Sequence, residues 1–123
     1  MRGSRSPSKR PEQVAETIRQ VITDALVRGE VRDPRVGLVT VTGVRVTGDV
    51  SHARILIAAG EPGPEQQRVL DGLRSAAGFL RSKVARALTT RTVPELHFEI
   101  DKGLEHAARI DALLGELKRG SPD

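Results

Sequence analysis

The stretch that decides the fold is residues 64–88, PEQQRVLDGLRSAAGFLRSKVARAL. Apolar residues recur in it every three or four positions, which is the period of a helix with one buried face. They are Leu73, Ala76, Leu80, Val84 and Ala87, with Val69, Leu70, Ala77 and Leu88 beside them. Small residues at 75–78 interrupt the pattern, and glycine inside a helix costs about 1 kcal/mol relative to alanine. We therefore expect two helices joined by a bend, at which backbones approach closely.

The side of this stretch away from the apolar stripe is basic. The basic residues between positions 68 and 91 are Arg68, Arg74, Arg81, Lys83, Arg86 and Arg91, and the only acid between those positions is Asp71. Such residues can simply form the solvated face of an amphipathic helix. A solubilising face normally mixes both signs, however, and the planar guanidinium group suits bidentate contacts with phosphate. The stretch thus predicts a positive surface for an anionic partner. Phe79 falls on this polar side of a straight helix, and we expect the bend to return it to the core.

Three other segments alternate between apolar and polar residues, as strands do. They are residues 38–47, 53–59 and 96–100. In the first segment the inward-facing residues change from odd to even positions across Gly43, which predicts a β-bulge. The first two segments form an antiparallel hairpin around the turn at 47–49. Along the second, Arg54 lies on the face away from the core.

Two more helices complete the chain. One runs from Pro11 to Gly29 with a strong apolar stripe, and the other follows Asp101, a helix-capping residue, as far as Leu117. The order helix, strand, strand, helix pair, strand, helix predicts an α+β domain in which helices cover one face of a three-stranded sheet. We assign residues 10–118 to this domain, residues 1–9 to a flexible basic arm and residues 119–123 to a tail.

The composition limits the possible functions. The 123 residues suit one domain, and the first ten carry four basic residues and no acid, equal to the net charge of +4. There is no cysteine, no apolar run as long as a membrane span, and no signal sequence, so we expect a soluble, cytoplasmic protein. There is also no tryptophan or tyrosine, so base stacking cannot be the main mode of binding to a nucleic acid.

The sequence offers no evident site for catalysis or for a cofactor. The three histidines, at positions 52, 97 and 106, fall on two strands and a helix, without the local spacing of a metal motif. Phosphate-binding loops and nucleophile elbows are absent. Asp33, Asp49 and Asp101 occupy turns or caps, where aspartate is common for structural reasons. We therefore expect no catalytic residue, no metal and no cofactor.

Four blocks of the sequence, in this order, resemble the ribosome-binding factor A family. They are DPRVGLVTVTGVRVTGDVSHARILI, SAAGFLRSKVARAL, RTVPELHFEID and LEHAARIDALL. The resemblance covers residues 11–117 and implies a KH-like fold of the second type, in which an Ala-x-Gly kink, here Ala76 to Gly78, replaces the usual Gly-x-x-Gly loop. One departure is Ala107, where the family usually has glycine.

The resemblance also implies a function. Members of that family are non-catalytic, monomeric factors associated with growth in the cold, which bind the immature small (30S) ribosomal subunit and its 16S rRNA. Together with the basic face, this predicts ten RNA-contacting residues. They are Arg35, Arg45, Arg54, Arg74, Ala76, Gly78, Arg81, Lys83, Arg86 and Arg91. Two alternatives stay open: a protein–protein interaction module with an incidental basic surface, and an uncharacterised enzyme. A steep salt dependence of binding would favour RNA over a protein partner.

Overall fold

The computed structural model describes residues 9–120 and contains the elements expected from the sequence, in the expected order. They are α1 (Lys9–Val27), β1 (Thr40–Val46), β2 (His52–Ala58), α2 (Pro64–Ser75), α3 (Ala77–Ala87), β3 (Glu95–Ile100) and α4 (Lys102–Gly120). The α+β class is confirmed. Within residues 9–120, no helix combines the length and the apolar character needed to cross a membrane.

The sheet has the strand order β1-β2-β3. β1 and β2 pair in an antiparallel hairpin, and their register shifts between Val41 and Gly43, so the predicted bulge is confirmed. β2 and β3 are parallel, because the α2–α3 pair carries the chain back to the starting end of β2. The carboxyl ends of β2 and β3 therefore lie together, and so do their amino ends.

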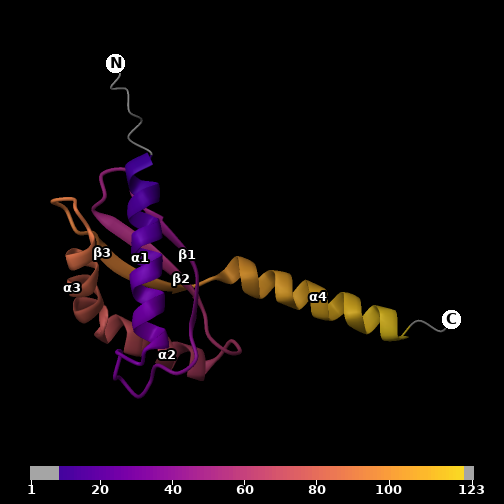
Figure 1. The fold of residues 1–123 in the computed structure, drawn as a ribbon. Coiled ribbons are helices and arrows are strands. Elements are labelled where there is room, and N and C mark those ends of the chain that lie inside the picture. Colours follow the sequence, from indigo (N-terminus) through magenta and orange to yellow (C-terminus); the bar gives the residue numbers. More distant parts are fainter. Residues whose placement is uncertain (1–8, 121–123) are drawn as a thin grey trace.

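The core lies on one face of this sheet, which α1, α2 and α3 cover (Figure 1). Alternate residues of β2 are fully buried beneath the helices, whereas His52 and Arg54 lie on the opposite, exposed face, as the two-residue period predicts. The largest buried side chains come from α1, the sheet and the α2–α3 pair, and they include Phe98, Ile18, Ile22, Ile55, Ile57, Leu73, Leu80 and Val84. The outer face of the sheet remains free for polar side chains.

The bend between α2 and α3 is confirmed at Ala76, which has φ −88° and ψ 1°. The expected close approach lies elsewhere, since a Cβ atom at Gly78 would meet no atom within 4 Å. At Gly72, one turn before the bend, a Cβ atom would lie 2.7 Å from Val36 Cγ2. The glycine that permits close packing is thus in the last turn of α2, against the loop that precedes β1.

The expectation that Phe79 returns to the core is wrong, because its exposed fraction is 47%. A single non-helical residue separates the helices, and the turn of α3 that follows directs Leu80 and Val84 inward. Phe79, one position away, remains at the surface. Lys83 Nζ lies over its ring, 5.6 Å from the centroid, so the ring serves a cation rather than the core.

The first and last helices extend slightly past residues 10–118, which the sequence analysis assigned to the domain. α1 begins at Lys9, inside the expected arm, because Pro11 is compatible with a first helical turn that needs no N–H donor. The rest of the arm, residues 1–8, lies outside the described residues, as do residues 121–123 of the tail. α4 continues to Gly120, two residues beyond the predicted domain end.

The last helix begins as predicted, since Asp101 Oδ1 accepts a hydrogen bond from the Leu104 N–H at 3.0 Å. It then points away from the body of the domain (Figure 1). Its apolar side chains have exposed fractions of 42–71%. They are Leu104, Ile110, Leu113, Leu114 and Leu117. The apolar stripe of α4 is therefore formed but not covered by the domain itself.

Candidate nucleic-acid interface

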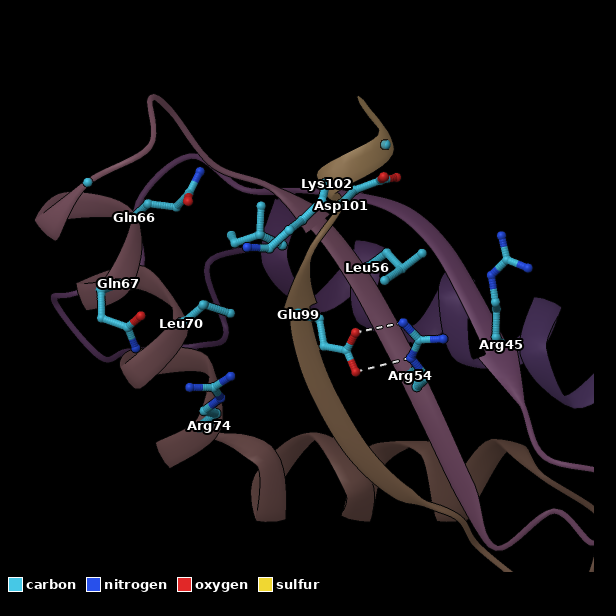
Figure 2. Close-up of a pocket in the computed structure, with 13 residues that line it drawn as sticks. Arg45, Arg54, Leu56, Gln66, Gln67, Leu70, Arg74, Glu99, Asp101 and Lys102 are labelled. Carbon is cyan, nitrogen blue, oxygen red and sulfur yellow. Dashed lines mark hydrogen bonds and ion pairs between the residues drawn. The ribbon is translucent and has the colours of Figure 1, made fainter. Parts of the chain in front are cut away.

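An open groove of about 710 Å³ lies between α2 and the outer face of the sheet, near the start of α4. Figure 2 shows α2 on one side, β2 and β3 on the other, and Lys102 extending from α4 toward α2. Four basic side chains line it: Arg45, Arg54, Arg74 and Lys102. They come from β1, β2, α2 and α4, so only the folded chain brings them together. Leu56, Leu70 and Ile100 form the apolar part of the lining.

Two acidic residues share the groove, but each is already engaged. Arg54 donates two hydrogen bonds to Glu99, at 2.8 and 3.1 Å, which lower the pKa of that carboxyl (Figure 2). Asp101 accepts a hydrogen bond of 2.6 Å from Thr42 Oγ1 and caps α4, and its pKa is also lowered, chiefly by the Thr42 bond. Both groups therefore stay ionised at neutral pH, and four cations against two anions leave the groove positive.

The basic side chains of the groove differ in how much they are held. Arg74, in the last turn of α2, donates one hydrogen bond to the Phe98 carbonyl at 3.2 Å, and its other N–H groups remain available to a ligand. For Arg45 and Lys102, no hydrogen bond or ion pair is found with another residue of the described range. These two are the cations most available to a ligand.

The sequence analysis predicted only the arginines of the groove, and the polar residues that it missed include Gln66, Gln67 and Lys102. Positions 66, 70 and 74 are spaced by four, so helical periodicity from Arg74 could have placed the glutamines on the same side of α2. Gln67 donates a hydrogen bond to Asp71 at 3.0 Å, and Gln66 is buried beside the Ala59 carbonyl. No sequence pattern could have placed Lys102 in the groove, because the position of its side chain depends on the direction in which the chain passes from β3 into α4.

The bend forms a second region, held by Arg35. This side chain donates two hydrogen bonds to Asp33, at 2.9 and 2.6 Å, and one to Ser75 Oγ at 3.0 Å. It therefore ties the loop before β1 to the end of α2. The bonds from Arg35 lower the pKa of Asp33 to about 2. Of the two predicted small residues, Ala76 packs partly against the core, whereas Gly78 is exposed.

The basic residues of α3 do not form one surface. Arg81 donates hydrogen bonds to the carbonyls of Val93 and Pro94, at 2.7 and 3.2 Å, beside the start of β3. Lys83 pairs with Glu30 at 2.8 Å across to the loop after α1, an acid that the sequence window did not include. The bonds from Lys83 lower the pKa of Glu30. Arg86 and Arg91 are exposed, and no partner for either is found within residues 9–120.

The ten predicted residues thus divide by location. Arg45, Arg54 and Arg74 meet in the groove, Arg35, Ala76 and Gly78 lie at the bend, and the others are spread over α3 and the loop that follows it. The arrangement offers a cationic, partly apolar groove that suits a phosphate backbone.

Comparisons with known proteins agree with this description. The family model for ribosome-binding factor A matches residues 10–114. Ribosome-binding factor A of Desulforamulus reducens is 43% identical over 110 residues, which cover 89% of this chain and 91% of that protein.

Solved structures extend the likeness to the fold. The solution structure of a ribosome-binding factor A homologue from Thermotoga maritima matches with a TM-score of 0.65 and 26% identity, covering 78% of this chain and 91% of the other. The Thermus thermophilus factor, as a homology model fitted into a cryo-EM map of its 30S complex, matches with a TM-score of 0.52 and 26% identity, covering 73% and 89%. The KH-like fold is thereby established, and the chain belongs to the ribosome-binding factor A family.

Proposed function

We propose that this chain is a non-catalytic assembly factor that binds the small ribosomal subunit and contacts its 16S rRNA through the groove of Figure 2. The observation that carries the proposal is the convergence of Arg45, Arg54, Arg74 and Lys102 from four elements on one groove. The Thermus thermophilus homologue, placed in a map of a 30S complex, supports the choice of partner. Since ribosomes are assembled in the cytoplasm, we place the protein there.

The mode of contact follows from the side chains that the chain has. Arginine and lysine bind phosphate oxygens, and the chain has neither tryptophan nor tyrosine for base stacking. We assign the main contact to the free cations Arg45 and Lys102, with Arg54 and Arg74 beside them. Arg86, Arg91 and the exposed backbone around Gly78 supply further contacts outside the groove. Arg35, Arg81 and Lys83, which bond within the chain, contribute mainly by holding the surface in place.

Such a factor acts by differential affinity. A protein shifts an equilibrium between two RNA arrangements only by the amount by which it binds one more tightly than the other. We therefore infer that the groove fits the immature arrangement of the rRNA. The protein stabilises that form and leaves once the arrangement changes.

The experiment is a salt titration of binding to purified small subunits. The test variant combines Arg45→Gln with Lys102→Gln, which removes two charges without removing a hydrogen bond found in the described part of the chain. The matched control combines Arg32→Gln with Arg109→Gln, two exposed positions outside the groove. We expect the test variant to bind more weakly at low salt, with a log–log slope shallower by about one unit for each lost contact, and the control to behave like wild type.

Equal losses in the two variants would contradict a role for the groove, and a flat salt response of the wild type would contradict RNA as the main partner. The flat response is what the alternative, a protein–protein interaction module, predicts. The uncovered apolar stripe of α4 is the one observation that favours this alternative. Binding that resists salt but is lost on Leu114→Ser would support it.

A further inference from the structure

Three metal-ligating side chains gather on the outer face of the sheet, where β2 and β3 begin. They are His52, Glu95 and His97, and their donor atoms all lie within 4.8 Å of one another. The parallel register explains the meeting, because His52 on β2 is paired with Glu95 on β3, and His97 is two residues further along the same face. Local sequence spacing could not reveal this set, since His52 and His97 are 45 residues apart.

The distances resemble those of a coordination shell. His52 Nδ1 lies 3.0 Å from His97 Nε2, and each of these nitrogens lies 3.8 Å from Glu95 Oε1. In a tetrahedral zinc site, bonds of 2.0 to 2.1 Å place two donor atoms roughly 3.3 Å apart. Shifts well under 1 Å would therefore bring all three atoms to binding distance. Side chains that are half exposed can make such shifts freely.

The backbone beneath the cluster is held on both strands. The Glu95 N–H donates to the Ser51 carbonyl at 2.9 Å, and the Thr47 N–H donates to the His52 carbonyl at 2.9 Å. Arg54, the nearest cation on the same face of β2, is occupied by its two bonds to Glu99. The cluster thus has fixed Cα positions, one carboxylate and no free competing cation within β2 or β3.

We propose that His52, Glu95 and His97 form a binding site for a divalent transition-metal ion of the zinc class. Two imidazoles and a carboxylate suit zinc, whereas calcium and magnesium prefer oxygen ligands alone. The exposed fractions of the side chains, 46 to 60%, leave a fourth position open to water or to another ligand. A bound ion would join β2 to β3 where both strands begin, and would stabilise the folded chain by mass action.

The test uses the full-length, tag-free chain after treatment with a chelator. Titration with zinc chloride is expected to show one saturable site in calorimetry and a rise in the unfolding midpoint. Cobalt(II) is expected to give the visible absorption of a tetrahedral complex. His52→Ala, His97→Ala and Glu95→Gln should each lose these signals. The matched control is His106→Ala, which removes the remaining histidine, exposed on α4 and outside the cluster, and should keep them.

The variants are compared with wild type in the absence of metal, where equal unfolding midpoints show that the exposed substitutions leave the fold intact. Zinc binding that survives in the His52→Ala, His97→Ala double variant would overturn the proposal. So would a wild-type chain that shows no saturable binding, or a loss of the site in His106→Ala. None of these outcomes tests the groove, because His52, Glu95 and His97 are not among the residues that line it.

Discussion

At the scale of single residues, several arginines form hydrogen bonds with other residues of the same chain. Arg35 shows this most clearly, because its two bonds to Asp33 hold the pKa of that carboxyl at about 2, against an ordinary value of 3.8. A carboxyl whose pKa is lower in the folded state stabilises the fold above its ordinary pKa. That contribution is lost as the pH falls from about 4 toward 2.

This gives a prediction about pH. The coupling between the two side chains, measured with Asp33→Asn, Arg35→Gln and the double variant, should stabilise the fold at pH 6 and disappear as the pH is lowered to about 2. The measurement is urea unfolding at a series of pH values. Other acids titrate in the same range, but they do so in all four proteins and cancel in the cycle. A coupling that stays constant over this range would contradict the assigned cause of the pKa shift.

The sequence could identify the basic residues but not their partners. Arg74, Arg81 and Lys83 were grouped as one free surface because the residues around them contain a single acid. In the fold they bond to Phe98, to Val93 and Pro94, and to Glu30, all on other elements. Such partners depend on tertiary packing, which local composition does not contain. The same limit hid the histidine pair, whose members meet only through the pairing of β2 with β3.

At the scale of elements, periodicity was a sufficient guide to most of the fold. Apolar residues that recur every three or four positions located the helices. The shift in the alternation of inward-facing residues at Gly43 located the bulge. The bend at Ala76 was also predictable, because small residues interrupt the stripe. Periodicity did not show which small residue packs closely against another segment. The close approach was therefore expected at the bend that contains Gly78, whereas the structure has it at Gly72.

That distinction can be tested with a pair of substitutions. Gly72→Ala would place a Cβ atom 2.7 Å from Val36 Cγ2 and 3.1 Å from Arg35 Cβ, so we expect it to lower the free energy of unfolding by about 1 to 3 kcal/mol. Gly78→Ala meets no atom within 4 Å and should raise it by up to about 1 kcal/mol, because alanine favours the helix. Urea unfolding measures both. If Gly78→Ala destabilised the fold more than Gly72→Ala, the close contact would lie at the bend and not at Gly72.

At the scale of the whole molecule, the structure separates a folded body from a projecting helix. α4 begins at Asp101 and carries its apolar side chains into solvent (Figure 1). We therefore expect a chain that ends at Leu104 to keep the unfolding midpoint of the full chain within about 4 °C, which corresponds to a change below about 1 kcal/mol. Thermal unfolding followed by circular dichroism measures this. A fall of about 8 °C or more would mean that α4 packs on the body.

Two arginines have a structural role at the outer edge of β3. β3 ends the sheet, so one side of its backbone has no neighbouring strand, and Arg74 and Arg81 direct guanidinium groups at carbonyls along that side. An unguarded border of this kind is a template on which a second molecule can add its own strand and begin to aggregate. Arg74 and Arg81 can therefore protect this strand edge whether or not the chain binds RNA, so their presence alone does not demonstrate an RNA contact.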